Sequence, residues 1–459
     1  SSLERIFGPG GWLARHHPRY EYRPAQLEMA EEVAAALEHR RHLIAEAGTG
    51  TGKTLAYLIP IILSGRRVVI STGTKNLQEQ LFTKDLPFLK RLFPDVRATL
   101  MKGRANYLCR QKLYDLERQP VLNGLEEVDL YPQIRKWEER TKIGDRAELA
   151  GLPDQSELWA RIDARREACT GQKCPQFERC FITLMHQRAA ESDVIIVNHH
   201  LFFADLALKQ TDYATLLPDY QAVVFDEAHE LEDVATRYFG VQFSNYRLEE
   251  LARDTEHTLR EKDLRSAEVG AAIADLRRRA ETFFSLFPSR EGRFAFQNRD
   301  QFLEGNRAAY GSLLNALLRV ETELKRTKDR PEEINNLARR AAELRGTLEM
   351  VIESDDRNFV FWWERRGRGV FVEASPIDVS AILRQRLFDQ VETTILTSAT
   401  LAVCGTFDFL KRRLGLDLAA EHVFPSHFDF KSQALLYTPS QMPDPRDGRS
   451  PGRAADEVV

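Results

Sequence analysis

The segment that most constrains the fold of this chain is a glycine-rich run at residues 46–54, which reads Glu-Ala-Gly-Thr-Gly-Thr-Gly-Lys-Thr. It follows a short apolar run at His42–Glu46 and opens a stretch of helical pattern that begins near Lys53. Because glycine lacks a Cβ atom, the backbone N–H groups of such a loop can converge on phosphate oxygens, and the helix N-terminus adds a favourable dipole. A strand, this loop and a helix in that order predict a phosphate-binding loop in a parallel α/β fold.

The same pattern predicts individual nucleotide contacts. We expect Lys53 to reach the β- and γ-phosphates and the Thr54 hydroxyl to bind Mg²⁺. The general pattern begins with glycine where this chain has Ala47. The alternative is an ordinary glycine-rich turn with a chance Lys-Thr pair. The expected nucleotide-binding residues of the loop are Ala47, Gly48, Thr49, Gly50, Thr51, Gly52, Lys53 and Thr54.

Further short runs have the β-branched, apolar character of buried strands. They are Arg67–Thr72, Ala98–Met101, Val194–Val197, Ala222–Phe225 and Thr394–Thr397. Helical stretches begin near Lys53 and Lys75. Alternating strands and helices of this kind predict a parallel sheet with helices on both faces.

Two of these runs end in polar residues that suit hydrolytic chemistry. Asp226-Glu227-Ala228-His229 follows one run directly, and parallel strands present their carboxyl ends to ligands. We expect Asp226 to hold Mg²⁺, Glu227 to orient and deprotonate the attacking water, and His229 to link nucleotide state to a neighbouring domain. A solvated helix start is the alternative. Residues 396–400 (Leu-Thr-Ser-Ala-Thr) place hydroxyls at the same edge, where Ser398 and Thr400 can bridge the acidic motif and a nucleic-acid path; an ordinary strand-to-turn transition is the alternative.

Other segments at this edge suit contacts with nucleic acid or with a base. Residues 72–80 offer Thr72, Thr74 and a helix N-terminus for the phosphates of a single strand. Residues 102–107, with Lys102, Arg104 and Tyr107, form a small basic-aromatic patch of the same kind. Upstream, residues 22–26 (Tyr-Arg-Pro-Ala-Gln) include Arg23 and Gln26, and the amide of Gln26 can read an adenine edge.

Four of the five cysteines form a spaced set, Cys109, Cys169, Cys174 and Cys180. Zinc modules usually carry two matched Cys-x₂₋₄-Cys pairs, whereas these intervals are uneven. The spacing favours a 4Fe–4S cluster, with zinc or unliganded cysteines as alternatives. Cys404 stands apart, and we expect it to be a buried small hydrophobe.

Composition excludes some classes. The chain has 459 residues, 65 Lys+Arg and 69 Asp+Glu, so any basic surface must be local. The longest apolar run, Leu55–Leu63, is too short to span a bilayer, and the first residues lack a signal-peptide pattern. We therefore expect an intracellular protein without disulfides. The sheet pattern is interrupted twice, from about 102 to 190 and from about 236 to 385. The second interruption consists of long charged helices such as Arg247–Leu286 and Asn306–Ile352. The segment Thr438–Arg453 has the composition of a linker.

Taken together and in this order, the motifs resemble the iron–sulfur helicases of superfamily 2, the XPD/DinG group, and most of all bacterial DinG-like proteins. Residues 197–201 (Val-Asn-His-His-Leu) add to the match. The resemblance implies a RecA-like parallel sheet interrupted by a helical iron–sulfur domain and a helical arch domain. The implied division is 1–101, 191–235 and 386–432 for the first RecA-like domain, 102–190 for the cluster domain, 236–385 for the arch, and 433–459 for a linker and the start of a second RecA-like domain.

The resemblance also implies ATP-dependent 5′→3′ translocation and unwinding of DNA in repair or replication, with Mg²⁺ as cofactor. It places Asn198 and His199 near the DNA. The chain returns from the arch to the RecA-like domain through an aromatic and basic run, Phe361-Trp362-Trp363 with Arg365, Arg366 and Arg368. This run is either a base-stacking segment or a core strand with a solvated turn. Single-stranded or forked DNA, and single-strand-binding or repair proteins, are the implied partners of a monomer in the bacterial cytoplasm and nucleoid.

Family members carry a second RecA-like domain with an arginine finger, whereas this sequence stops near its expected start. We therefore expect a truncated chain that by itself binds ATP poorly and hydrolyses little. The competing hypotheses are a non-catalytic nucleic-acid-binding fragment with a structural metal site and a phosphate-loop ATPase that is not a helicase.

Overall fold

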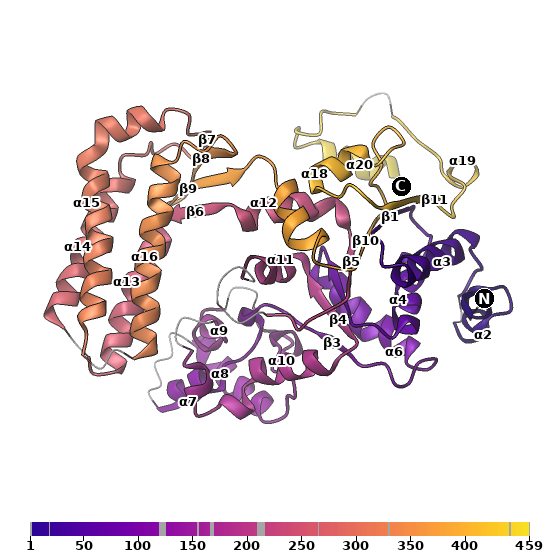
Figure 1. The fold of residues 1–459 in the computed structure, drawn as a ribbon, viewed down its shortest axis with the longest axis horizontal. Helices are drawn as coiled ribbons and strands as arrows, with labels where there is room; N and C mark the ends of the chain where they lie inside the picture. The colour runs from indigo at the N-terminus through magenta and orange to yellow at the C-terminus, as the bar shows by residue number, and fades with distance from the viewer. Residues whose placement is uncertain are drawn as a thin grey trace.

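The computed structural model describes residues 2–17, 19–118, 125–153, 156–165, 169–208, 216–264, 266–328, 331–439 and 442–458. Its centre is a seven-stranded parallel sheet in the order β11-β1-β10-β5-β2-β4-β3 (Figure 1). The strands are β1 (Leu43–Ala47), β2 (Val68–Thr72), β3 (Ala98–Leu100), β4 (Val194–Asn198), β5 (Ala222–Asp226), β10 (Thr393–Ser398) and β11 (Ala420–Phe424). The predicted parallel α/β fold class is confirmed. The edge strand β11 was not predicted, because it lacks a continuous apolar run.

Helices cover both faces of this sheet, because the strand side chains are buried on both sides. In β2, Val68 and Ile70 join one apolar cluster while Val69 joins the cluster on the opposite face. One face carries α1 (Ser2–Phe7), α2 (Trp12–His16), α3 (Pro24–Glu38), α4 (Lys53–Ser64), α5 (Lys75–Gln80), the π-helix η1 (Leu81–Asp85) and α6 (Leu86–Leu89). The other carries α10 (Phe181–Glu191), α11 (His199–Leu208), α12 (Leu231–Phe239), α17 (Ser380–Leu383), the π-helix η8 (Arg384–Phe388) and α18 (Asp408–Leu414).

The chain between β3 and α10 forms a small helical subdomain that lies beside the sheet (Figure 1). Its own apolar cluster includes Leu108, Trp159 and Phe181. Its elements are η2 (Arg104–Asn106), α7 (Arg110–Arg118), α8 (Leu125–Glu138), η3 (Arg146–Glu148), α9 (Glu157–Ile162), η5 (Gly171–Lys173) and η6 (Phe177–Arg179).

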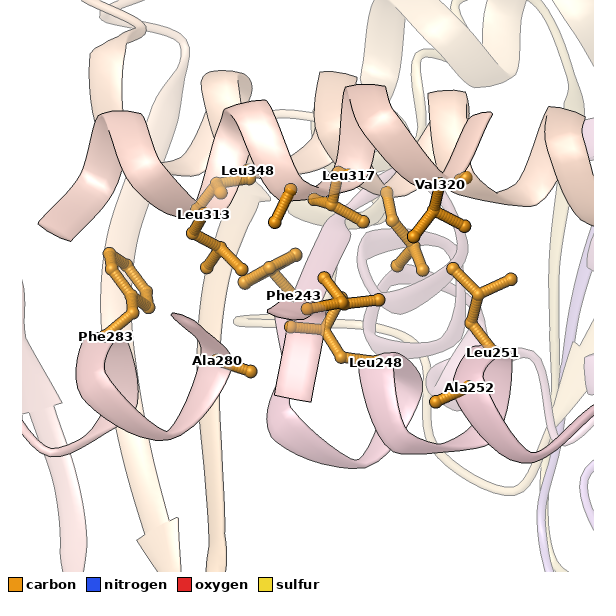
Figure 2. Close-up of a cluster of buried hydrophobic side chains, with 14 of the residues drawn as sticks. Phe243, Leu248, Leu251, Ala252, Ala280, Phe283, Leu313, Leu317, Val320 and Leu348 are labelled. Carbon is orange, nitrogen blue, oxygen red and sulfur yellow. The ribbon is translucent and has the colours of Figure 1, made fainter. Parts of the chain in front are cut away.

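The chain between α12 and α17 forms a second, larger insertion that projects to the left in Figure 1. Four antiparallel helices pack in sequence order, and the first also packs on the last. Figure 2 shows part of the apolar cluster that these helices bury, with Leu313, Leu317 and Leu348 among the labelled residues. The helices are α13 (Asn245–Glu261), α14 (Ala267–Phe284), α15 (Arg299–Arg326) and α16 (Glu332–Glu353).

The prediction of two very long helices in this insertion is wrong, because each is divided by a reversal of the chain. Asp263 adopts a left-handed φ of 52°, and the Ser266 hydroxyl then caps α14 by accepting a hydrogen bond from the Val269 N–H. At the second division, Pro331 precedes α16 and cannot donate the hydrogen bond that would continue α15. Each predicted helix is therefore a packed pair.

A four-stranded antiparallel sheet in the order β6-β9-β8-β7 completes this insertion. Its strands are β6 (Val241–Ser244), β7 (Gly292–Ala295), β8 (Phe359–Arg366) and β9 (Gly369–Pro376). Gly367, with a φ of 55°, turns β8 into β9, so the aromatic run 361–363 is a strand followed by an exposed turn. Two short helices lie near the end of the chain, α19 (Phe430–Gln433) and α20 (Ser450–Val458), the latter beginning inside the predicted linker. Among the described residues, no helix has both the length and the apolar character that crossing a membrane requires.

Candidate functional site

The predicted motifs meet at one edge of the parallel sheet, where the carboxyl ends of its strands lie side by side. Strand β1 pairs with β10 so that Glu46 lies opposite Ser398, and β10 pairs with β5 so that Thr397 lies opposite Asp226. The three loops that follow these strands are therefore neighbours although they are far apart in the sequence. This is the edge at which ligands bind in open α/β sheets.

The glycine-rich loop has the predicted course between β1 and α4. Gly50 and Gly52 have φ values of 80° and 83°, which residues with side chains rarely adopt. A Cβ atom on Gly48 would lie 2.7 Å from the backbone nitrogen of Ser426, and the Thr51 hydroxyl closes the loop on the Gly48 carbonyl at 2.6 Å. Helix α4 begins at Lys53.

Two side chains upstream of the loop contact its backbone. Nη1 of Arg23 donates to the Gly50 carbonyl at 2.5 Å, and Nε2 of Gln26 donates to the Gly52 carbonyl at 3.0 Å. Gln26 is buried, and its Oε1 has no hydrogen-bond partner within the described part of the chain. A buried acceptor without a partner is costly, so this oxygen is suited to a donor on a bound ligand.

Thr54 and Asp226 converge on one phenol group. The Tyr57 hydroxyl donates to Oδ2 of Asp226 at 3.0 Å and also forms a hydrogen bond with Thr54. Asp226 is buried, and burial raises the pKa of its carboxyl while the positive charge of Lys53 acts in the opposite direction. A carboxylate and a hydroxyl at one sheet edge are hard oxygen donors of the kind that Mg²⁺ prefers. Tyr57 was not predicted from the sequence, because it belongs to none of the motifs.

Glu227 lies at the centre of the second group of contacts. Its backbone is left-handed, with φ 60° and ψ 47°, a conformation that non-glycine residues adopt at a cost and mostly at functional sites. One carboxylate oxygen lies 3.7 Å from Nζ of Lys53, and the other accepts from the Ser398 hydroxyl at 3.1 Å. Nδ1 of His229 lies 2.9 Å from the same hydroxyl. The structure therefore brings together residues from all three motifs. Thr400, by contrast, is exposed and lies outside this group.

Glu46, the residue that opens the phosphate loop, was not singled out from the sequence. Its Oε2 accepts hydrogen bonds from the backbone N–H groups of Leu401 and Ala402, each at 2.6 Å. These two residues directly follow the segment that contains Ser398. Glu46 thus ties the strand that precedes the phosphate loop to the loop after β10, the strand that ends at Ser398, and only the tertiary pairing of β1 with β10 reveals this.

The residues expected to contact DNA after β2 and β4 have mixed positions. Thr74 is exposed and caps α5, whereas Thr72 is buried and donates to the Thr74 carbonyl at 3.1 Å. Oδ1 of Asn198 caps α11 by accepting from the Leu201 N–H at 2.7 Å. His199 is fully buried with Nδ1 2.7 Å from the Ser71 hydroxyl, and burial lowers the pKa of His199 to about 4. A DNA contact by Thr72 or His199 would first require these side chains to be uncovered.

Residues 102–107 were predicted to form a basic-aromatic surface patch, but its first and last residues are not on the surface. Lys102 and Tyr107 are buried, and Nζ of Lys102 lies 2.7 Å from Asp145 and 2.9 Å from Glu79. The ammonium group is therefore neutralised within the protein. Arg104 donates to the Ala164 carbonyl at 2.7 Å and to Sγ of Cys169 at 3.3 Å.

Of the cysteine set, Cys109, Cys169 and Cys180 are close enough in the small subdomain for their charges to interact, and burial raises the pKa of Cys109. Within the described ranges, however, these side chains and their neighbours do not form a group of three or more ligands that could hold a metal ion. The expectation that Cys404 is buried is wrong, since it is exposed in the turn that joins Val403 to Thr406. A turn of this kind is short enough to leave its tip in solvent.

A phosphate loop facing an Asp-Glu-Ala-His motif on a parallel sheet defines a nucleotide-binding motor domain of the helicase class. The family model for DEAD/DEAH box helicases matches residues 23–135. The chain is 32% identical over 446 residues to the ATP-dependent DNA helicase YoaA of Haemophilus influenzae, covering 97% of this chain and 70% of that protein. It is 29% identical over 475 residues to the ATP-dependent helicase DinG of Mycobacterium tuberculosis, covering 95% of this chain and 69% of that protein. This chain belongs to the family of ATP-dependent DNA helicases that includes YoaA and DinG.

A solved XPD helicase structure also aligns with the fold, at 16% identity and a TM-score of 0.46. The alignment covers 88% of this chain and 62% of the XPD chain. ATP and Mg²⁺ are the cofactors that membership of an ATP-dependent helicase family implies.

Proposed function

We propose that this protein uses ATP hydrolysis to move 5′→3′ along single-stranded DNA and to unwind duplexes during repair or replication. The observation that carries the proposal is the convergence of Lys53, Asp226, Glu227 and Ser398 at one sheet edge. A simple nucleotide-binding protein does not need the contact between Glu227 and Ser398 at the end of β10. Such a contact is useful where hydrolysis must respond to a second ligand.

In the proposed hydrolysis, each residue of the edge has one task. Lys53 contacts the β- and γ-phosphates, while Thr54 and Asp226 hold Mg²⁺, which when bound neutralises charge on the phosphate oxygens. Glu227 accepts the proton of the attacking water. The hydrogen bonds of Asp226 and Thr54 with Tyr57 support their assignment to one ion, because they bring both oxygen donors to the same point.

The remaining nucleotide contacts follow from the loop and its upstream neighbours. Backbone groups of residues 47–52 cradle the phosphates, Arg23 braces the loop, and the unpartnered Oε1 of Gln26 accepts a hydrogen bond from the exocyclic amine of adenine. Ser398 and His229 transmit nucleotide state to the DNA path, with Thr400 at its exposed end.

DNA binding at the strand ends is proposed for the residues predicted there. Thr74 at the N-terminus of α5 is exposed, and Asn198 at the end of β4 is partly exposed. Arg104 is also partly exposed and lies within the small helical subdomain, where it donates to Sγ of Cys169. The side chains of Lys102, Thr72 and His199 are buried, so we propose that they hold the DNA-binding segments in position.

We further propose that Cys109, Cys169, Cys174 and Cys180 hold a 4Fe–4S cluster, which would supply a structural staple for residues 102–190. Four thiols in one small subdomain are the right donor set, and Arg104 already donates to one sulfur. The test is iron and sulfide analysis of anaerobically purified protein with its visible spectrum. Loss of absorbance in a Cys174→Ser variant supports the cluster, and a colourless protein with stoichiometric zinc overturns it.

The proposed division of the chain is the one predicted from the sequence, with the RecA-like domain in three parts and the cluster and arch domains as insertions. We propose that the protein works as a monomer on single-stranded or forked DNA at the nucleoid, together with single-strand-binding or repair proteins. Size-exclusion chromatography with light scattering tests the monomer, because a stable dimer in the absence of DNA contradicts it.

The central experiment compares ATP binding and hydrolysis of the full-length protein and its Lys53→Ala variant, with and without single-stranded DNA. We expect DNA to stimulate hydrolysis and Lys53→Ala to abolish it, because Lys53 carries the charge that meets the γ-phosphate. Unwinding of duplexes with a 5′ or a 3′ single-stranded tail then tests the direction. DNA binding without any ATP binding or hydrolysis favours the second candidate, a non-catalytic nucleic-acid-binding protein.

A further inference from the structure

The antiparallel sheet of the large insertion has one face covered by helices and one face that the described elements leave open. Trp363 of β8 is 8% exposed and packs in the helical core. Its neighbours Trp362 and Glu364 point to the opposite face because side chains alternate along a strand. Val360 on this outer face is 53% exposed. An aromatic, partly exposed sheet face is unusual in a region whose helices carry its stability.

Two arginine–aromatic stacks occupy this outer face. The guanidinium carbon of Arg293 lies 3.9 Å from the centre of the Trp362 ring, and that of Arg366 lies 5.3 Å from the Phe371 ring. Both arginines pair with Glu364, whose side chain is only 15% exposed, while theirs are 61% and 60% exposed. The Glu364 carboxylate therefore lies beneath the two guanidinium groups and holds them in place. At the surface, guanidinium groups and ring planes are more exposed than the carboxylates of this face.

The rings form a row across the strands. Trp362 lies opposite Glu373, two residues beyond Phe371, so the two rings are diagonal cross-strand neighbours about 7–8 Å apart. Tyr246, which is 50% exposed, extends the row with its ring centre 5.9 Å from that of Phe371. Nε1 of Trp362 donates to the Ser375 hydroxyl at 3.2 Å, which fixes the first ring. The spacing exceeds the rise of about 3.4 Å between stacked bases and so suits bases that have been separated.

We propose that this aromatic–arginine face (Tyr246, Arg293, Trp362, Arg366 and Phe371) binds single-stranded DNA by stacking unpaired bases between its rings and guanidinium groups. Sequence-tolerant binding of single strands combines these two features, positive charge for the backbone and ring planes for the bases. The most exposed charges of the face are the two arginines, whereas the carboxylates of Glu364 and Glu373 are partly buried between the rings. Charged and polar groups therefore interrupt the rings, so the face lacks the continuous apolar centre of a protein interface. The inference rests on the proposed function and extends its DNA path onto the arch.

The test is the affinity of the protein for a fluorescent oligothymidine of about 16 nucleotides, measured by anisotropy. Trp362→Ala should weaken binding by about 5-fold or more, because one base–aromatic stack contributes on the order of 1–3 kcal/mol. Trp362→Phe keeps a ring and should bind nearly as tightly as the unaltered protein. Arg293→Glu reverses the charge that stacks on Trp362 and pairs with Glu364, and should lower both the affinity and its salt dependence. Arg278→Ala, which removes an exposed arginine from α14, should leave affinity unchanged.

The outcomes separate this inference from the function on which it rests. Unaltered protein that fails to bind the strand contradicts both. Unaltered protein that binds, with Trp362→Ala and Arg293→Glu binding equally well, overturns the inference alone. Photocrosslinking of a bromodeoxyuridine strand to the peptide that contains residues 359–366 supports it without any variant. Equal loss of affinity in Trp362→Phe and Trp362→Ala overturns the stacking explanation, and preferential binding of an RNA strand by this face overturns the assignment to DNA.

Discussion

The edge of the parallel sheet and the helical insertion are built on opposite principles. At the edge, polar side chains such as Asp226, Ser398 and Gln26 are buried, and each is held by hydrogen bonds to a residue far away in the sequence. In the insertion the interior is almost wholly apolar (Figure 2). Its charges lie outside in pairs such as Arg277 with Glu249 and Glu256. Burying polar groups costs free energy unless they serve a ligand or a reaction. Substitutions at the edge should therefore change chemistry, and those in the insertion should change stability.

The largest expected effect is on turnover at the edge. In Glu227→Gln the hydrogen bond from Ser398 can remain, but the base is lost, so ATP hydrolysis should fall by about 100-fold to 10,000-fold while ATP binding persists. The measurement is steady-state hydrolysis with a nucleotide-binding assay. Glu392→Gln, which removes an exposed carboxylate paired with Arg66, is the matched control and should turn over normally. Normal rates in Glu227→Gln would remove this residue from the base role.

The next effect tests the opposite side of the comparison. Leu313→Ala deletes a fully buried side chain of α15 and should destabilise the insertion by about 2–5 kcal/mol. Leu318→Ala on the same helix, where the side chain is 44% exposed, should cost about 0.5 kcal/mol or less. Denaturant unfolding measures both, and ATP binding should persist in both under native conditions. Loss of ATP binding in Leu313→Ala at temperatures where the protein is folded would show that the two regions are not separable.

A third prediction concerns a buried ionisable group beside the edge. Burial lowers the pKa of His199 from 6.5 to about 4. Between about pH 6.5 and about pH 4, this imidazole is therefore protonated in the unfolded chain and neutral in the folded protein. Stability should therefore fall as pH falls through this window, by about 2 kcal/mol between roughly pH 7 and pH 5 from this residue alone. His199→Gln should flatten that slope in unfolding experiments, whereas the exposed His39→Gln should not. An unchanged slope in His199→Gln contradicts the prediction.

The smallest effect should come from Glu46, which holds the loop after β10 without touching the reacting groups. Glu46→Ala leaves the N–H groups of Leu401 and Ala402 without their acceptor and should lower DNA-stimulated hydrolysis by about 5-fold, on the order of 1 kcal/mol. Glu46→Gln keeps one acceptor oxygen and should recover most of the rate. Equal losses in the two variants would indicate a charge effect instead of a positioning effect.

The sheet strands and the phosphate loop were predictable because their signals are local. A buried parallel strand is a continuous apolar run, so β2, β4, β5 and β10 were placed to within about two residues. The antiparallel sheet was missed as a sheet because the amphipathic strands β6 and β7 lie among long helices and lack such runs. Lys102 was misjudged for a related reason, because a lysine in sequence gives no sign of the two carboxylates that enclose it.

By itself the sequence determined the class of fold, the loop that meets phosphate and the acidic motif after β5, because glycine spacing and hydrophobic period act over a few residues. Tertiary structure alone decided which of these segments touch. The register of β1 with β10 and of β10 with β5 brings Glu46, Ser398 and Asp226 to one edge, and the bend of the chain at β8 and β9 lines up Trp362 with Phe371. Such contacts depend on hydrogen bonding between strands that are distant along the chain, and no local pattern encodes that pairing.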